Sequence, residues 1–313
     1  MSKVAVIGAG HVGATAVYYT AEKDIADVVM VDVVPDMPQC KALDFLHTAP
    51  LRGYNASIVG SNDYAAIKDA DVVVLTAGIP RKPGMDRMDL LKTNVEIART
   101  AAQAIARYAP DAVVVSVSNP LDIIAMVVLR ETGFAFRNVV GMAGVLDSTR
   151  FRYFIADALG VWPGDVDAMV LGGHGDSMVP LTGCASVGGV PISELLDRET
   201  IDQLIDRTRK GGAEIVGHLK TGSAYYAPGA ATAKMVEAIV CDQKLLIPAS
   251  AYLRGEYGYR DIFLGVPVLL GGHGVERIIE VDLRDAERKA LDQSARAVEE
   301  GVELLESFYQ PGK

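Results

Sequence analysis

Apolar and polar residues alternate with two different periods in the first half of the chain. Short runs rich in valine, isoleucine and leucine occur at residues 3–7, 27–31, 71–75 and 112–117. Such runs are typical of parallel strands that are buried on both faces. Between them lie stretches with helical periodicity at 12–23, 37–47 and 89–108. Shorter apolar runs at 57–60 and 138–141 are expected to add a strand and to close this domain. The alternation predicts a doubly wound α/β sheet.

The second half has a different pattern. A helix is expected at 147–159, followed by glycine-punctuated runs typical of antiparallel strands at 168–171, 181–187 and 190–191. Further helices are expected at 199–218 and 223–241, then a hairpin of 262–270 with 275–281, and a charged terminal helix from 285 to about 308. We therefore expect two domains, at 1–143 and 144–313, the second an α+β domain with antiparallel strands.

Composition narrows the class of protein. Half of the 313 residues are hydrophobic and the formal net charge is −10. An acidic chain is a poor candidate for binding nucleic acid, which needs a basic face. The longest apolar stretch, 112–129, is interrupted by Asn119-Pro120, so no membrane helix is expected.

The cysteines and the N-terminus bear on the compartment. Cys40, Cys184 and Cys241 lie far apart, without the spacing of metal ligands, so no metal is expected. Sparse cysteines are typical of reduced thiols in the cytosol. The N-terminus does not have the pattern of a signal peptide. We therefore expect a cytoplasmic protein.

A glycine-rich loop follows the first predicted strand. Its sequence, Gly8-Ala9-Gly10-His11-Val12-Gly13, matches G-x-G-x-x-G and opens a predicted helix. Asp32 ends the next strand, about 20 residues beyond Gly13, as in dinucleotide-binding sites. The alternative is a glycine turn in another α/β fold. The strand–loop–helix context favours a Rossmann domain, with pyrophosphate at the helix N-terminus. His11 occupies a variable position of the loop.

Asp32 also indicates which dinucleotide is bound. Its carboxylate can accept hydrogen bonds from the adenosine ribose hydroxyls and would repel a 2′-phosphate. No arginine follows it, because the next residues are Val33 and Val34. We therefore expect NAD rather than NADP as the cofactor.

A basic loop at residues 78–87 follows the strand at 71–75. It contains Arg81, Lys82 and Arg87 together with two prolines and two glycines. Ligands of parallel sheets bind beyond the carboxyl ends of strands, and guanidinium groups match carboxylates bidentately. Arg81 and Arg87 are thus candidates for binding an anionic substrate. A solvated basic loop is an equal alternative on this pattern alone.

A possible acid–base pair lies in the second half. Asp147 and Arg150 are three residues apart at the start of a predicted helix, so they can face one side. His174 lies in the turn Gly172-Gly173-His174-Gly175-Asp176. A histidine could take the hydroxyl proton of a 2-hydroxy acid. Asp147 could orient the imidazole, and Arg150 could bind the substrate carboxylate.

The same tetrapeptide sequence occurs a second time in the chain, around another histidine. Gly271-Gly272-His273-Gly274 repeats Gly172–Gly175, and spacing cannot distinguish the two. Because His273 lies between two apolar runs, it is expected in a hairpin turn. A histidine in a glycine turn can also have a purely structural role. His47 and His218, which lie in predicted helices, are expected to be structural as well.

Together these motifs resemble the lactate/malate dehydrogenase family, most of all its lactate dehydrogenase-like malate dehydrogenases. The resemblance covers nearly the whole chain. It rests on the glycine loop with Asp32 and on the segments 77–87, 117–120, 144–151, 172–176 and 222–228. It implies NAD as cofactor and reversible oxidation of malate to oxaloacetate.

The resemblance also implies residue roles. His174 would accept the proton, with Asp147 as its orienting partner, and this favours His174 over His273. Arg150 would bind the substrate carboxylate, and Arg87 would polarise the reacting carbonyl. Asn119 would contact substrate, its bond to Pro120 being cis. The cofactor site would be lined by Asn94, Val117, Ser118 and Asn119.

Arg81 bears on the choice of substrate. Lactate dehydrogenases generally have a neutral residue there, whereas a second arginine suits a second carboxylate. With pyruvate, a buried unpaired arginine would cost about 3–5 kcal/mol. The alternative within the family is a lactate or other 2-hydroxy-acid dehydrogenase.

Two other classes remain as alternatives. A short-chain dehydrogenase would use Tyr-x-x-x-Lys, which occurs at Tyr19/Lys23 and Tyr64/Lys68, too early in the chain. A non-catalytic NAD-binding sensor would not need the set of His174, Asp147 and Arg150. The resemblance further implies a homo-oligomer, with a tetramer favoured over a dimer.

Overall fold

The computed structural model describes residues 2–79 and 87–309, apart from the side chain of Arg87. It divides into two compact units. Unit 1 comprises residues 1–142, 224–245 and 269–277, and unit 2 comprises 143–223, 246–268 and 278–313. The sequence pattern predicts a domain boundary at residue 143, and the first change of unit falls at residue 142. Residues 224–245 and 269–277 also pack with unit 1.

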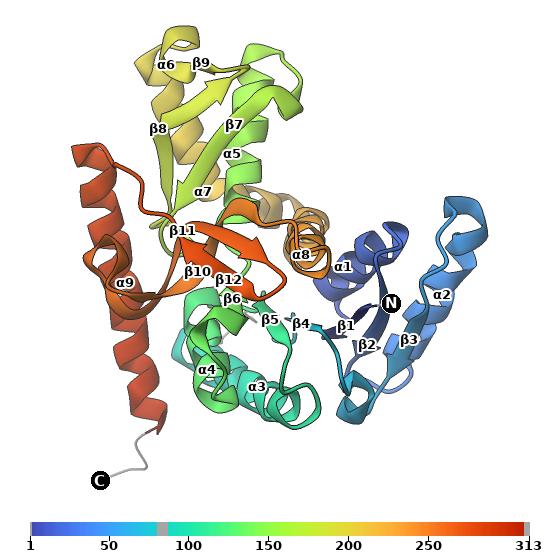
Figure 1. Cartoon of the computed structure of the whole chain (residues 1–313). Coiled ribbons are helices and arrows are strands. Elements are labelled where there is room, and N and C mark those ends of the chain that lie inside the picture. Colours follow the sequence, from blue (N-terminus) through green and yellow to red (C-terminus); the bar gives the residue numbers. More distant parts are fainter. Residues whose placement is uncertain (1, 80–86, 310–313) are drawn as a thin grey trace. The chain divides into compact units, whose positions relative to one another are not determined.

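Unit 1 is built on a parallel sheet whose strands follow the order β3-β2-β1-β4-β5-β6 (Figure 1). The strands are β1 (Ser2–Ile7), β2 (Ala26–Val31), β3 (Ile58–Ser61), β4 (Val72–Leu75), β5 (Val113–Ser116) and β6 (Val139–Gly141). In β4 and β5 every residue is buried, which accounts for their unbroken valine runs. The order reverses between β1 and β4, where ligands of such sheets bind.

In the described part of unit 1 there are five α-helices: α1 (His11–Glu22), α2 (Met37–Arg52), α3 (Arg87–Tyr108), α4 (Leu121–Thr132) and α8 (Tyr226–Val240). Short 3₁₀ turns lie at Tyr64–Ile67 (η1) and Phe136–Asn138 (η2). Helix α8 packs closely on α1, since a Cβ at Gly229 would come within 2.5 Å of the Thr15 side chain. This contact holds a late segment of the chain in the first unit.

In the described part of unit 1, helices α4 and α2 differ from the sequence expectation. Helix α4 was not predicted, because its run of apolar residues has no polar face from which a period could be read. Eight of its residues are buried. Helix α2 continues past Pro50, and it ends where Gly53 adopts the left-handed conformation with φ of +78°.

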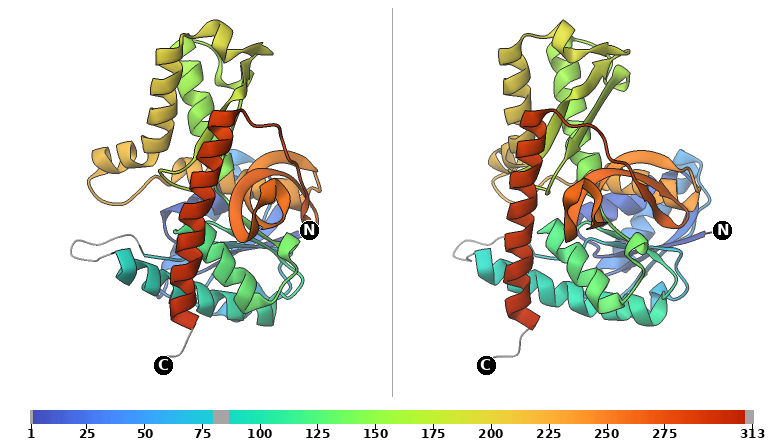
Figure 2. Two further views of the ribbon diagram at one scale, coloured as in Figure 1. Left: turned by 90° about the vertical axis from the view of Figure 1, so that its left-hand side faces the viewer. Right: turned by 60° about the vertical axis from the view of Figure 1, so that its left-hand side comes forward.

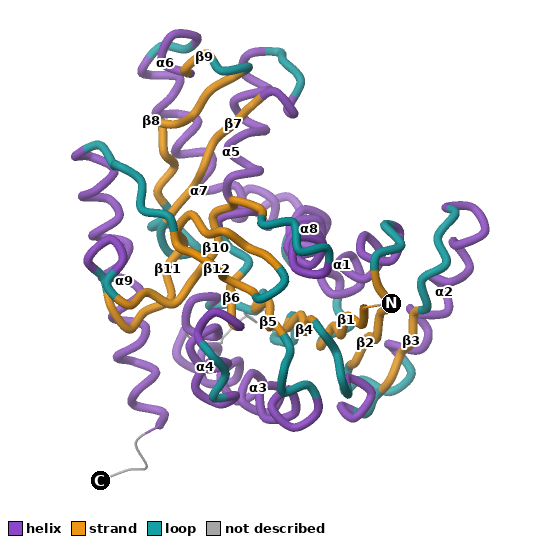
Figure 3. The backbone as a smooth tube through the Cα atoms, in the orientation of Figure 1, coloured by secondary structure: helices purple, strands orange, loops and turns teal. Residues whose placement is uncertain are grey.

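Unit 2 contains a three-stranded antiparallel sheet of β7 (Val166–Leu171), β8 (Val179–Val187) and β9 (Val190–Pro191). Figure 3 shows β7 and β8 side by side. The helices α5 (Gly144–Leu159), α6 (Ile192–Leu195) and α7 (Arg198–Leu219) accompany it, with a 3₁₀ turn η3 at Pro163–Asp165. Its core joins helix and sheet residues, among them Phe151, Ile155, Val166, Val170, Ile192 and Leu204.

The last part of the chain adds β10 (Leu245–Arg254), β11 (Arg260–Gly271) and β12 (Gly274–Ile278), which are neighbours in this order. A 3₁₀ turn η4 at Glu256–Gly258 joins β10 to β11. Strand β10 was not predicted, because Pro248 and the two alanines that follow it, Ala249 and Ala251, weaken the strand pattern. Helix α9 (Asp285–Tyr309) is the long terminal helix drawn in red in Figure 2.

The expected fold class is confirmed: a doubly wound parallel sheet is accompanied by an α+β part with antiparallel strands. Among the described residues, none of the helices combines the length and apolarity needed to cross a membrane.

Candidate active site

The glycine-rich loop connects β1 to α1 at the point where the strand order reverses. Gly8 has φ of +110°, a conformation that favours glycine, and a Cβ there would lie 2.6 Å from Oγ1 of Thr76. A Cβ at Gly13 would overlap the carbonyl oxygen of Gly8. Both glycines are therefore required by close backbone packing after β1 and β4.

Gly10 has a different role. A Cβ at this position would meet nothing within 4 Å, and Gly10 precedes α1 without a side-chain cap. The first backbone N–H groups of α1 can therefore receive an anion, with the positive end of the helix dipole behind them. These features fit the pyrophosphate of a dinucleotide.

His11, the first residue of α1, stacks on Tyr225 with ring centroids 4.9 Å apart. The local sequence did not indicate this role for Tyr225, because its partner lies 214 positions earlier in the chain. The stack places an aromatic side chain from the start of α8 beside the glycine-rich loop.

The Asp32 carboxylate is bound on both oxygens by backbone N–H groups. Ala9 donates to Oδ2 at 2.6 Å and Val34 donates to Oδ1 at 2.9 Å. In addition, the Lys41 ammonium donates to the carbonyl oxygen of Ala9 at 2.5 Å. Asp32 thus joins the glycine-rich loop to the loop after β2.

Asn94, on α3, ties together two segments beyond the ends of β4 and β5. Its side-chain amide donates to the carbonyl oxygen of Asn119 at 2.9 Å and accepts from the N–H of Ile79 at 2.9 Å. The Ser118 hydroxyl donates to the carbonyl of Ala77 at 2.6 Å. Val117 and Ser118 are buried. The Asn119-Pro120 bond is cis, as the resemblance implied.

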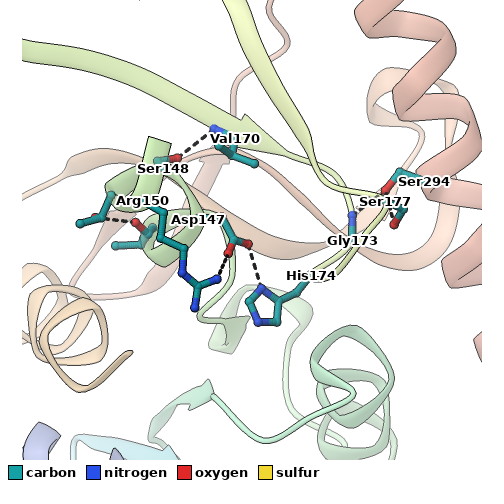
Figure 4. A network of polar contacts seen from close by, with 10 residues as sticks. Asp147, Ser148, Arg150, Val170, Gly173, His174, Ser177 and Ser294 are labelled. Atoms are coloured by element: carbon teal, nitrogen blue, oxygen red, sulfur yellow. Dashed lines mark hydrogen bonds and ion pairs between the residues drawn. The ribbon is translucent and has the colours of Figure 1, made fainter. Parts of the chain in front are cut away.

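In unit 2, Asp147 binds both His174 and Arg150 (Figure 4). Its Oδ2 lies 2.8 Å from Nδ1 of His174, and its Oδ1 accepts from Nη1 of Arg150 at 3.0 Å. The Asp147 side chain is only 2% exposed, whereas those of Arg150 and His174 are 14% and 15% exposed. The structure therefore brings together His174, Asp147 and Arg150, which the sequence analysis had grouped as a possible acid–base site.

The turn that carries His174 is fixed by its neighbours. Gly172 pairs with Gly265 through two backbone hydrogen bonds, and a Cβ on Gly265 would collide with the carbonyl oxygen of Gly172. The Gly173 N–H donates to Oγ of the fully buried Ser294, on α9, at 2.8 Å. No local sequence signal links Ser294 to a turn more than a hundred positions earlier, so sequence analysis missed it.

Two glycines of α7 face Arg150. A Cβ on Gly211 would lie 3.2 Å from Cδ of Arg150, and one on Gly212 would lie 3.7 Å from its Nη2. The missing side chains leave room for the guanidinium group. A Gly-Gly pair inside an otherwise regular helical pattern was the available signal for this role.

Some expected residues lie elsewhere. Arg81 and the side chain of Arg87 lie outside the described residues; the backbone of α3 begins at Arg87. His273 lies in the turn between β11 and β12 in unit 1, as its context predicted. Within residues 2–79 and 87–309, no group of three or more His, Cys, Asp and Glu side chains could hold a metal ion.

The set in unit 2 has the parts needed for oxidation of a hydroxy acid. Because an ionised Asp147 carboxylate can only accept, a neutral His174 beside it donates from Nδ1 and has its lone pair on Nε2, which can accept a proton. The negative charge of Asp147 would stabilise an imidazolium formed in this way. Arg150 offers a guanidinium group to a carboxylate.

Fold and site together define an NAD-dependent oxidoreductase. Residues 2–141 match the model of the lactate/malate dehydrogenase NAD binding domain, and residues 144–309 match that of the lactate/malate dehydrogenase alpha/beta C-terminal domain. The chain belongs to the lactate/malate dehydrogenase family.

Relatives are similar along their full length. A malate dehydrogenase of Rhodopirellula baltica is 51% identical over 309 residues, which cover 98% of each chain. The structure of a malate dehydrogenase from Salinibacter ruber superposes with a TM-score of 0.95 at 46% identity, covering 99% of this chain and 100% of that one. A Cryptosporidium parvum lactate dehydrogenase, complexed with lactic acid and NAD, has a TM-score of 0.94 at 43% identity and covers 97% and 98%.

Proposed function

We propose that the protein is an NAD-dependent malate dehydrogenase, which reversibly oxidises (S)-malate to oxaloacetate. The observation that carries the proposal is the Asp147 carboxylate, which binds His174 through one oxygen and Arg150 through the other. Full-length similarity to proteins named malate dehydrogenase supports the choice of substrate. The reaction is one of the tricarboxylic acid cycle.

In the proposed reaction, Nε2 of His174 accepts the proton of the malate hydroxyl as the C2–H bond breaks. Asp147 holds the imidazole ring through Nδ1 and stabilises its charged form. In the reverse direction, the imidazolium returns the proton to the carbonyl oxygen of oxaloacetate. General acid–base catalysis of this kind contributes about 10²–10⁴-fold to the rate.

Arg150 would hold the C1 carboxylate of the substrate next to His174. Asn119 would contact the substrate, Arg87 would polarise the reacting carbonyl, and Arg81 would bind the second carboxylate of malate. Binding the substrate at both ends orients C2 with respect to the proton acceptor. Positioning of this kind is a major source of rate enhancement.

NAD, when bound, would supply the acceptor for the hydride that leaves C2 of malate. The loop Gly8-Ala9-Gly10-His11-Val12-Gly13 would hold its pyrophosphate, and Asp32 would bind the adenosine ribose. Asn94, Val117, Ser118 and Asn119 would line the rest of the cofactor site. In this scheme residues 1–143 serve as the NAD-binding domain and 144–313 as the catalytic domain.

The substrate is tested by comparing Arg81→Gln with the wild type on oxaloacetate and pyruvate, each with NADH. We expect kcat/KM for oxaloacetate to fall about 10²-fold or more, because one carboxylate of the substrate loses its charged partner, which costs about 3 kcal/mol. The value of kcat/KM for pyruvate should stay unchanged or rise. Equal losses on both substrates, or a wild type that prefers pyruvate, would favour the lactate dehydrogenase alternative.

We further propose a cytoplasmic homo-oligomer, with a tetramer favoured over a dimer. Helix α2 supports self-association, because it buries only Pro38 and Ala42 within the chain and exposes Leu43, Leu46 and Leu51. A helix with such an apolar surface gains stability when a second copy covers it. Sedimentation equilibrium of the wild type and of Leu43→Glu tests this proposal. A monomeric wild type would contradict it.

A further inference from the structure

Asn62 follows β3 directly, and its side-chain amide is fully used in hydrogen bonds. Its Nδ2 donates to the carbonyl oxygens of Asp32 at 2.7 Å and Val34 at 2.8 Å. Its Oδ1 accepts from Nε2 of Gln39 at 2.8 Å and, more weakly, from the N–H of Asp36 at 3.4 Å. One exposed side chain thus binds the loop 32–36 at three points and the first turn of α2 at a fourth.

This loop has few other restraints. Val33 and Val34 are 75% and 44% exposed, so apolar burial does not fix their positions. Asp36 has φ of +60°, an uncommon conformation for a residue other than glycine, and it precedes α2 without a side-chain cap. Because a loop without buried apolar contacts opens at low cost in free energy, the bonds from Asn62 largely determine its conformation.

The same loop sets the position of the Asp32 carboxylate. Val34 donates its N–H to Oδ1 of Asp32, while Asn62 binds the carbonyl oxygens of both residues. Fixing these two carbonyls therefore fixes the N–H group that holds the carboxylate. Tyr64 follows two residues after Asn62, and burial and then the negative charge of Asp32 raise its pKa.

We propose that Asn62 is a positioning residue that determines selectivity for NAD over NADP. It keeps the Asp32 carboxylate where it meets the 2′- and 3′-hydroxyls of the adenosine ribose and repels a 2′-phosphate. The inference rests on the proposed role of Asp32 in binding this ribose. Asn62 itself does not touch the reacting atoms, so its loss affects the binding of the cofactor and leaves the chemical step unchanged.

The test compares the wild type with Asn62→Ala and Asn62→Leu. Leucine is close to asparagine in size but neither donates nor accepts a hydrogen bond, so it removes the bonds to the loop without adding a charge, and it serves if the alanine variant does not fold. The matched control is Asn55→Ala, an exposed asparagine before the other end of β3. For each protein, kcat and KM are measured for NADH and NADPH at saturating oxaloacetate, and Tm is measured by thermal unfolding.

We expect both Asn62 variants to raise KM for NADH at least tenfold while kcat stays within twofold. The ratio of kcat/KM for NADH to that for NADPH should fall at least tenfold, because the repulsion of the 2′-phosphate weakens together with the attraction of the ribose. Asn55→Ala should match the wild type in all these values.

Two results would overturn the inference. A lower Tm with an unchanged NADH/NADPH ratio of kcat/KM would make Asn62 a structural residue only. Equal losses in kcat/KM for NADH and NADPH would show that Asn62 does not act through Asp32. Asp32→Ser distinguishes these failures from a failure of the proposed function. If Asp32→Ser leaves the ratio unchanged, Asp32 does not select the cofactor. If it lowers the ratio and the Asn62 variants do not, only the inference about Asn62 is wrong.

Discussion

Oδ2 of Asp147 lies 2.8 Å from Nδ1 of His174, and the opposite oxygen of the same carboxylate binds Arg150. One nearly inaccessible carboxylate therefore orients both the proposed proton acceptor and the proposed carboxylate-binding group. The two functions share a single anchor on the first turn of α5. A change at Asp147 should consequently affect chemistry and stability together.

Asp147→Asn should lower kcat by about 10²–10⁴-fold, because a neutral amide cannot stabilise the imidazolium form of His174. It also leaves Arg150 without its negative partner, so the free energy of unfolding should fall by up to about 3 kcal/mol. Steady-state kinetics and urea unfolding measure the two effects. Asp202→Asn, in an exposed pair with Arg198, is the control and should change stability by less than about 1 kcal/mol. A fully active Asp147→Asn variant would contradict the proposed mechanism.

His174→Asn should reduce turnover of oxaloacetate by at least about 10²-fold, because the proton acceptor is lost. His273→Asn should retain normal activity, since that residue lies in the turn between β11 and β12. Measuring kcat for both variants separates two histidines with the same flanking glycines. The reverse outcome would assign catalysis to His273. Binding of NADH without turnover in the wild type would instead indicate a sensor.

Gly211→Ala should raise KM for oxaloacetate several-fold, because the new Cβ would lie 3.2 Å from Cδ of Arg150 and would force the guanidinium group to shift. Gly217→Ala is the matched control on the same helix, where a Cβ would meet nothing within 4 Å. It should stabilise α7 by up to about 1 kcal/mol without affecting KM. Steady-state kinetics and Tm of both variants provide the test. An unchanged KM in Gly211→Ala would show that Arg150 tolerates the added methyl group.

Asp242→Asn should lower Tm at neutral pH but not at acidic pH. The backbone N–H of Gly272 and then the Lys244 ammonium lower the pKa of Asp242 below its ordinary value of 3.8. A lowered pKa in the folded state stabilises the protein above the unfolded value, and this contribution is lost as pH falls through the folded value. Tm of the wild type and the variant, measured from pH 7 downward, should therefore converge below about pH 4. A difference in Tm that is independent of pH would contradict this account. Asparagine is a suitable replacement because Asp242 has a positive φ of 46°.

Much of the fold could be predicted from local pattern. The strands of unit 1 were predicted because unbroken valine runs are typical of buried parallel strands, and the glycine loop was predicted because its backbone needs residues without a Cβ. Helix α4 and strand β10 could not be predicted in this way. One is apolar on all sides, and the other contains a proline, so neither shows a clear period.

The sequence by itself determined the class of the protein: a glycine loop with Asp32, and a histidine, an aspartate and an arginine suited to a hydroxy acid. Only the tertiary structure decided which residues meet. It joined Asp147 to His174, Ser294 to the turn of Gly173, and Asn62 to the loop of Asp32. Local periodicity reflects how each segment buries its own apolar face. Contacts between distant polar side chains leave no such periodic trace, because they depend on how the elements pack.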